Sequence, residues 1–269
     1  MNRYMLGACA KRRFTTIDIE DITHDGITSS VPNAANAMCF SNDGTKFYCA
    51  NNKTVYQYNL STAWDLSTMS LGGNIAISQS YNLYSLAVNS TGTRMFLCFS
   101  DTYSTYGYDR IYQYSMTDGN VTTLSYNSQY NIYSSAGINW YGGDCHFDEA
   151  NLNFYITSSD ENIYQFKFNS ADTMLPISYI GGVSYSGLDN DMVGLAMTEN
   201  KVIITGSQTK VAYQYSYDGS DITTLTYDNK SFDFSSPQLN NPRYCQFKPD
   251  YTKFYVLSNY IIYQYSTNI

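Results

Sequence analysis

The sequence predicts an all-β fold, a five-bladed β-propeller made of four-stranded antiparallel blades. A Tyr-Gln-Tyr segment, or a one-residue variant of it, occurs five times, centred on Gln57, Gln113, Gln165, Gln214 and Gln264. Neighbouring copies lie 49 to 56 residues apart, which is the range of a propeller blade and longer than a leucine-rich or ankyrin repeat. Each copy follows two short apolar segments joined by a turn, so every period predicts the same order of strands.

The first three strands of each blade follow from this repeat. The first strand is a short apolar segment, at residues 37–40, 86–88, 145–147, 195–197 and 245–247. After a turn that is usually rich in Asn, Asp or Gly comes the second strand, at residues 46–49, 94–97, 153–156, 202–204 and 253–256. The Tyr-Gln-Tyr segment is the third strand, because large aromatic and polar residues alternate there with the period of two that a pleated strand imposes.

The fourth strand decides the number of blades and the way the ring closes. Residues 121–126 and 222–227 are near copies of one another, and residues 14–19 carry a third copy. We therefore expect residues 14–19 to pair with residues 262–265, which completes a fifth blade and leaves no open sheet edge. The prediction is one propeller domain over residues 14–269, closed by its N-terminal strand and preceded by a basic leader over residues 1–13.

Composition and charge narrow the possible partners. The chain has 269 residues, of which 14% are charged and 16% are aromatic, and its formal net charge is −8. Nucleic-acid binding is not expected, because it depends on clustered Lys and Arg that neutralise phosphates. Four basic residues do lie in the leader, namely Arg3, Lys11, Arg12 and Arg13. They form either a solvated, frayed end or a short anchor to an acidic partner.

No motif predicts a cofactor, a metal or a membrane segment. The six cysteines show no Cys-x-x-Cys spacing, although Asp and Asn oxygens in the channel could hold a calcium ion. Cys39 and Cys49 flank one turn and could form a disulfide, but a buried free thiol is the more common arrangement. No apolar stretch approaches the roughly 20 residues that cross a membrane. The apolar run over residues 4–9 is too short for a secretory signal.

Candidate binding residues lie in two sets of loops, those joining strand four to the next strand one and those joining strand two to strand three. Both sets emerge on one face around the channel, and the second blade has an expanded loop there, over residues 100–110. The candidate ligand-binding or partner-binding residues on this face are Asp101, Tyr103, Tyr106, Tyr108, Asp109, Trp140, Tyr141, Asp189, Asp191 and Arg243. The same loops carry amides such as Asn36 and Asn241.

These residue types leave several functions open. Aromatic rings beside Asn and Asp suit carbohydrate binding, because rings stack on the apolar face of a sugar while amides and carboxylates bind its hydroxyls. Tyr-rich loops suit protein contacts equally well, and ordinary polar loops without a ligand are the third reading. A glycosidase would need two carboxylates with separate roles, for which Asp144, Asp189 and Asp191 are the candidates. Equivalent loops carry Asn, which cannot exchange a proton, so no catalytic residue is expected.

Two segments resemble a propeller repeat of bacteriophage virion proteins and bacterial surface proteins. Residues 40–48 read Phe-Ser-Asn-Asp-Gly-Thr-Lys-Phe-Tyr, and residues 55–68 read Val-Tyr-Gln-Tyr-Asn-Leu-Ser-Thr-Ala-Trp-Asp-Leu-Ser-Thr. The match as a motif covers about residues 36–68, because later blades replace the Trp-Asp link. The resemblance implies a non-enzymatic module for adhesion or assembly and supplies no catalytic residue.

We therefore expect a non-enzymatic virion structural protein of a bacteriophage, used for host-surface attachment or for capsid or tail decoration. Its expected partners are other virion proteins and a glycan or protein on the host surface. It would be assembled in the host cytoplasm and be extracellular in the mature virion. A lectin-like carbohydrate-binding propeller is the alternative, and a propeller glycosidase is the third reading.

Overall fold

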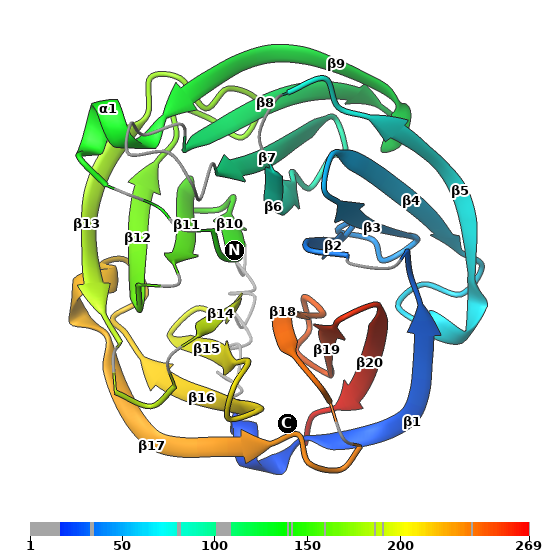
Figure 1. The fold of residues 1–269 in the computed structure, drawn as a ribbon, viewed down its shortest axis with the longest axis vertical. Coiled ribbons are helices and arrows are strands. Elements are labelled where there is room, and N and C mark those ends of the chain that lie inside the picture. The colour runs from blue at the N-terminus through cyan, green and yellow to red at the C-terminus, as the bar shows by residue number, and fades with distance from the viewer. Residues whose placement is uncertain are drawn as a thin grey trace, which may run out of the picture.

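The fold is an all-β propeller of five blades, each a four-stranded antiparallel sheet, as the sequence predicts. The structure is a computed structural model that describes residues 17–32, 35–79, 82–100, 109–138, 140, 142–158, 160–185, 187–189, 191–237 and 239–268. Figure 1 shows the five sheets around a central axis, with strand one of each blade innermost and strand four at the outside. In the described residues, no helix is both long and apolar enough to span a membrane.

The blades follow one another along the chain. Blade 1 contains β2 (Met38–Phe40), β3 (Lys46–Asn51), β4 (Thr54–Leu60) and β5 (Met69–Ala76). Blade 2 contains β6 (Asn82–Val88), β7 (Arg94–Ser100), β8 (Arg110–Thr117) and β9 (Asn120–Asn131). Blade 3 contains β10 (Cys145–Asp148), β11 (Asn153–Ser158), β12 (Asn162–Lys167) and β13 (Ser178–Ser184). Blade 4 contains β14 (Met192–Met197), β15 (Lys201–Gly206), β16 (Val211–Ser216) and β17 (Thr226–Asp233).

Blade 5 is assembled from both ends of the chain. It contains β18 (Pro242–Phe247), β19 (Lys253–Ser258), β20 (Ile261–Ser266) and, as its outer strand, β1 (Thr23–Ser30). β1 runs antiparallel to β20, with Thr28 opposite Tyr263 and Ser30 opposite Ile261 (Figure 1). The ring is therefore closed by an N-terminal strand, as expected.

The predicted position of that closing strand is wrong. The strand lies at Thr23–Ser30, whereas residues Ile19–Asp21 form the 3₁₀ helix η1 and residues 14–16 lie outside the described part of the chain. The Thr-Thr pair at positions 15 and 16 suggested the alignment. The equivalence that the fold uses is instead between Ile19, Val121 and Ile222, which make the same inter-blade contact. Short 3₁₀ helices also precede two other outer strands, η2 (Leu66–Thr68) and η3 (Ile222–Thr224), and α1 (Ile132–Ala136) follows β9.

The glutamine of each Tyr-Gln-Tyr segment joins two neighbouring blades. Its side-chain oxygen accepts a backbone N–H from a fully buried residue just before, or at the start of, the next blade's outer strand. The pairs are Gln57 with Val121 (3.0 Å), Gln113 with Met174 (2.9 Å), Gln165 with Ile222 (2.9 Å), Gln214 with Ile19 (2.9 Å) and Gln264 with Leu66 (3.4 Å). We call each pair a glutamine clasp. Buried amides need such a partner, so the clasps explain why the repeat contains Gln between its aromatic residues.

Aromatic side chains fill the space between blades, as their abundance predicts. Tyr48 and Tyr255 are fully buried, and their hydroxyls donate to carbonyls of the following blade, at Gly119 (2.8 Å) and Trp64 (2.6 Å). The ring therefore supplies apolar contact while the hydroxyl is satisfied. The five cysteines within the described residues are all buried and free, so the structure contains no Cys39–Cys49 disulfide.

Candidate binding site at the channel mouth

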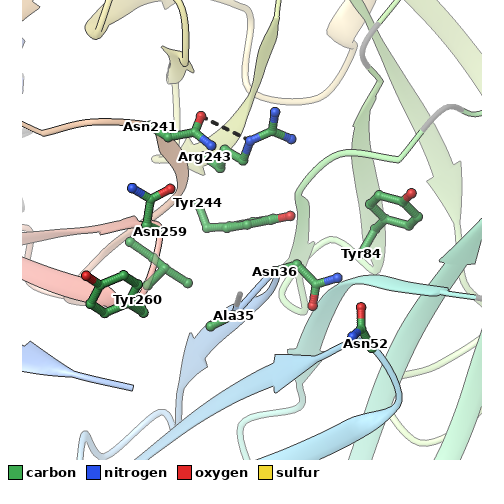
Figure 2. Close-up of a pocket in the computed structure, with 10 residues that line it drawn as sticks. Ala35, Asn36, Asn52, Tyr84, Asn241, Arg243, Tyr244, Asn259 and Tyr260 are labelled. Atoms are coloured by element: carbon green, nitrogen blue, oxygen red, sulfur yellow. Dashed lines mark hydrogen bonds between the residues drawn. The ribbon is translucent and has the colours of Figure 1, made fainter. Parts of the chain in front are cut away.

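A cavity of about 390 Å³ opens on the face that the sequence singles out. We call it the amide pocket. It lies among blades 5, 1 and 2, and it is lined by Ala35, Asn36, Asn52, Tyr84, Asn241, Arg243, Tyr244, Leu257, Asn259 and Tyr260. Figure 2 shows the Tyr244 ring reaching from the strand-one segment of blade 5 toward Tyr84 of blade 2, with the Asn36 and Asn52 amides below this line.

Two of the lining amides come from the turns that join strand two to strand three. Asn52 follows β3 and Asn259 follows β19, and both adopt the left-handed region, with φ of 50° and 56°. Asn tolerates this conformation better than most residues. The tight turn therefore places an exposed amide at the pocket rim in each of the two blades, and Tyr260, which is 46% exposed, follows Asn259 directly.

The Tyr84 ring lies against Gly142, a glycine that precedes the first strand of the next blade. A Cβ atom on Gly142, which has φ of +73°, would lie 2.4 Å from the Tyr84 ring. No side chain fits at that distance, so the glycine at position 142 leaves the space that the ring occupies. Tyr84 also packs edge-on against Trp140, with ring centroids 6.0 Å apart.

Among the predicted binding residues that the structure describes, Arg243 is the one that lines the amide pocket. Its Nη2 atom lies 2.6 Å from Oδ2 of Asp191, and its Nε donates to Asn241 at 3.1 Å. Asp191 also accepts a hydrogen bond from the Ser207 hydroxyl at 2.5 Å. The guanidinium charge is therefore paired within the protein, and the pair positions the Asn241 amide in the pocket wall.

Asp189 supports the neighbouring loop and is not presented to a ligand. The residue is 5% exposed, and its carboxylate accepts the backbone N–H of Asp191 at 2.8 Å and both the N–H and hydroxyl of Thr209 at 2.6 Å. Such a carboxylate fixes the backbone around it. The structure thus brings Asp189, Asp191 and Arg243 together, but as a supporting cluster beside the pocket.

Trp140 and Asp109 were predicted to be accessible, and the structure contradicts this. Trp140 is 1% exposed, and its indole N–H donates to the Thr157 carbonyl at 2.6 Å. Asp109 is 5% exposed and accepts the backbone N–H of Trp140 at 2.9 Å. A ring buried between blades 2 and 3 cannot stack on a ligand. The remaining predicted residues, Asp101, Tyr103, Tyr106, Tyr108 and Tyr141 on this face and Arg3, Lys11, Arg12 and Arg13 in the leader, lie outside the described residues.

Asp144 lies in the channel wall, where it joins three blades. Oδ1 accepts the N–H of Cys145 at 2.9 Å, and Oδ2 accepts the N–H groups of Leu195 at 3.1 Å and Cys245 at 3.3 Å. The residue is 2% exposed, and burial raises the pKa of its carboxyl to about 8, although the three amides act in the opposite direction. We call this arrangement the axial carboxyl. It connects the innermost strands of blades 3, 4 and 5.

The carboxylates considered for glycoside hydrolysis do not meet in an open site. Asp144 and Asp189 are buried, and Asp191 is paired with Arg243. In the part of the chain that the structure describes, there is also no group of three or more His, Cys, Asp or Glu side chains arranged to hold a metal ion.

Most of the amide pocket was not predicted from the sequence. Asn36 and Asn241 were expected on this face, whereas Asn52, Tyr84, Asn259 and Tyr260 were not singled out. A signal was available for two of them: Asn52 and Asn259 occupy equivalent two-residue turns between strands two and three of their blades.

Comparison with known proteins identifies the fold and nothing finer. No family model and no curated protein matches the sequence. A functionally unknown protein from Desulfotomaculum acetoxidans is similar in structure, with 12% identity and a TM-score of 0.52 over 85% of this chain and 64% of that one. A 6-phosphogluconolactonase candidate from Bacteroides fragilis is also similar, with 14% identity and a TM-score of 0.50 over 77% of this chain and 59% of that one. This chain thus covers less than two thirds of either structure.

Proposed function

We propose that this protein is a non-enzymatic attachment module that binds a glycan in the amide pocket. The observation that carries the proposal is the lining itself, in which the amides of Asn36, Asn52, Asn241 and Asn259 share one cavity with the rings of Tyr84, Tyr244 and Tyr260. Amides offer both donors and acceptors to hydroxyl groups. A concave site with aromatic walls and a few convergent polar groups is the usual form of a small-ligand site.

One lining atom already lacks a partner. The Asn36 side-chain oxygen is buried from solvent and accepts no hydrogen bond, although the residue lines the cavity. An unpaired buried acceptor costs free energy unless a water or a ligand group satisfies it. A sugar hydroxyl would relieve this cost once the Asn36 side chain turns this oxygen into the cavity.

Binding is favoured over hydrolysis because the described residues that line the amide pocket include no carboxylate and no histidine. Glycoside hydrolysis uses a carboxylic acid and a carboxylate on opposite sides of the scissile bond. Arg243 is the charged group in the described lining, and Asp191 neutralises it. A neutral sugar therefore fits the pocket better than an acidic one.

The biological setting we propose is a bacteriophage virion, where the module would attach to a host-surface glycan and to other virion proteins. This part rests on the resemblance of residues 36–68 to virion propeller repeats. Decoration of a capsid or tail through protein contacts alone is the second setting that the same resemblance supports.

The test is a glycan array of neutral and acidic oligosaccharides, followed by titration of the best neutral binder. We expect Tyr260→Ala and Asn241→Ala each to weaken binding by about tenfold, or about 1.4 kcal/mol, with unchanged circular dichroism. Tyr133→Ala is the matched control, because Tyr133 is also an exposed tyrosine, 38% accessible, but lies on α1 at the outside of the ring. Equal losses in the control, or no glycan binding at all, would reject the proposal. Release of reducing ends during incubation would reveal a glycosidase instead.

A further inference from the structure

The end of the channel opposite the amide pocket carries a larger cavity, of about 740 Å³, to which all five blades contribute. Its apolar wall contains one residue from the equivalent position near the end of each innermost strand: Phe40, Val88, Phe147, Met197 and Phe247. Trp64, Tyr217 and Tyr251 add three more rings to the lining. We call this the aromatic cavity. Its volume lies within the range of small-molecule sites, which combine aromatic walls with a small number of polar groups.

Two of these rings belong to residues with an unusual backbone conformation. Trp64 and Tyr251 have φ of 66° and 61°, in the left-handed region that bulky side chains rarely adopt. The Tyr251 N–H donates to the carbonyl three residues earlier, and in the same turn of blades 1 and 2 the donor is Gly44 or Gly92. Glycine adopts this conformation without strain. Tyr251 thus brings a ring to the cavity at a position where glycine suits the turn better, and such strain is concentrated at ligand sites.

Carboxylates outnumber cations in the aromatic cavity. Asp148, Glu149 and Glu199 line it, and Lys248 is the one cationic side chain among the described lining residues. The Lys248 ammonium lies 2.8 Å from the Asp250 carboxylate, which compensates its charge. The described lining is therefore net negative at neutral pH. A cavity whose walls carry one sign of charge attracts ligands of the opposite sign.

Neutral donors hold two of these carboxylates in place. Asp148 accepts the backbone N–H and the side-chain amide of Asn151, at 3.2 and 2.9 Å. Glu149 accepts the Ser90 hydroxyl at 2.9 Å and the Ser90 backbone N–H at 2.5 Å. Because these donors carry no net charge, both carboxylates keep their negative charge while their orientation is fixed.

His146 is a neutral polar group in the wall of the aromatic cavity. Burial lowers the pKa of its imidazole to about 4, against the opposing charge of Asp148, so the ring is uncharged at neutral pH. It packs near the Tyr155 ring, with centroids 6.5 Å apart, and forms no hydrogen bond with the described residues. A neutral imidazole offers one donor and one acceptor. His146 therefore leaves the charge of the carboxylates uncompensated and can bind a polar group of a ligand.

Aromatic and acidic side chains adjoin in one part of the cavity. Burial raises the pKa of Tyr217, and its neighbours Tyr155, Asp148 and Tyr251 raise it further. An organic ammonium ion is attracted both by the faces of aromatic rings and by carboxylates. A metal ion fits less well, because the described residues include no group of three or more His, Cys, Asp or Glu side chains that could hold one.

We propose that the aromatic cavity binds a small organic cation, an ammonium group that carries apolar substituents. The rings of Tyr217 and Tyr251 and the carboxylate of Asp148 bind the charged group, and the apolar wall contacts its substituents. The amide pocket lies at the other end of the channel, so this inference does not depend on glycan binding.

The test is titration of the full chain with choline and with hexyltrimethylammonium, measured by calorimetry and by tryptophan fluorescence. Trp64 lines the cavity, whereas Trp140 is buried between blades 2 and 3, so a change in fluorescence reports on the cavity. The neutral control is the carbon analogue of choline, in which carbon replaces the quaternary nitrogen. We expect both ammonium ions to bind saturably and the neutral analogue to bind about tenfold more weakly than choline.

Tyr251→Gly tests the ring without straining the fold, because glycine occupies this turn position in blades 1 and 2. We expect it to weaken binding of both ammonium ions about tenfold, with unchanged circular dichroism. Leu152→Gly is the matched control. Leu152 has φ of 56° in the equivalent turn of blade 3 and is not among the described lining residues, so we expect its replacement to leave the affinity unchanged.

Asp148→Asn tests the charge, since an amide can still accept the hydrogen bonds from Asn151. We expect a loss of affinity of about tenfold. Asp160→Asn is its control, because Asp160 lies in the turn between β11 and β12, on the other face. The inference is overturned if neither ammonium ion binds, or if the neutral analogue binds as tightly as choline. Equal losses in a cavity variant and its control would also overturn it.

Discussion

The contacts between blades near the rim of this propeller repeat in every blade, whereas a contact at its axis occurs once. Near the rim, the glutamine clasp occurs five times, including where the two ends of the chain meet, with a distance of 2.9–3.0 Å in four clasps and 3.4 Å between Gln264 and Leu66. At the axis, Asp144 occurs once and connects three blades. Contacts that repeat in every blade specify the fold, because each blade needs the same neighbours. Contacts that occur once mark where this ring departs from fivefold symmetry.

The close packing at the axis and the amide pocket lie on different sides of the channel. Blades 4 and 5 approach closely at the axis: a Cβ atom on Gly194 would lie 2.6 Å from the Arg243 carbonyl oxygen and 2.1 Å from the Thr205 hydroxyl. The axial carboxyl holds blades 3, 4 and 5 on that side, whereas the pocket lies among blades 5, 1 and 2. Close packing on one side of the channel thus accompanies a cavity on the other.

Removing the axial carboxyl is expected to have the largest effect on stability. Asp144→Ala leaves the buried N–H groups of Cys145, Leu195 and Cys245 without their acceptor. At about 1–3 kcal/mol for each unsatisfied group, the free energy of unfolding should fall by about 3–9 kcal/mol. Denaturant unfolding followed by circular dichroism measures this. A loss below about 1 kcal/mol would show that the axis does not hold the three blades together.

The pH dependence of stability tests whether burial raises the pKa of the Asp144 carboxyl in the folded protein. The folded pKa of Asp144, raised to about 8 by burial, exceeds the value of about 3.9 in an unfolded chain. Between these values the folded state binds a proton that the unfolded state has released, so this group makes stability fall as pH rises from about 4 to about 8. We expect the stability difference between wild type and Asp144→Asn to change by a few kcal/mol over this range. A pH-independent difference would place the folded pKa near its ordinary value.

The clasps are expected to give smaller effects that resemble one another. Gln57→Ala and Gln165→Ala each leave one buried N–H unpaired, at Val121 and at Ile222. Each should lower the free energy of unfolding by about 1–3 kcal/mol. The two losses should agree within about 1 kcal/mol, because the geometry is the same. A large loss at one clasp and none at the other would mean that equivalent clasps contribute unequally to the free energy of unfolding.

Much of the fold was predictable, because period and alternation are properties of the sequence. The repeat of blades follows from the recurrence of Tyr-Gln-Tyr, and the closure by an N-terminal strand was inferred from the copies of the fourth strand. The register of the closing strand did not follow, since the Thr-Thr pair at positions 15 and 16 aligns in sequence with Thr122-Thr123 and Thr223-Thr224, whereas the strand lies at Thr23–Ser30. A better signal was the pairing of a polar residue with a buried apolar one, as in Asp18-Ile19, Asp65-Leu66, Asn120-Val121 and Asp221-Ile222. In three of these pairs the Asp caps a 3₁₀ helix.

The candidate site was harder to predict, because burial depends on neighbouring blades. Nothing local distinguishes Trp140, which is enclosed by blades 2 and 3, from an exposed ring such as Tyr260. Likewise, Asp189 and Asp191 have the side chains of ligand-binding residues but bind Thr209 and Arg243. The face was predictable from loop topology, whereas the residues that meet across the channel were not.

The closing strand has a consequence for biosynthesis. Asp25 in β1 and its partner Ser266 in β20 are 241 positions apart, so β1 leaves the ribosome long before its partner has been made. During that interval it resembles an unpaired sheet edge, which invites aggregation when it is apolar. Its sequence, Thr-His-Asp-Gly-Ile-Thr-Ser-Ser, contains a single aliphatic side chain. The strand that stays unpaired during synthesis of the chain is thus polar and has little tendency to aggregate. Its pairing with β20 can be the last step in closing the ring.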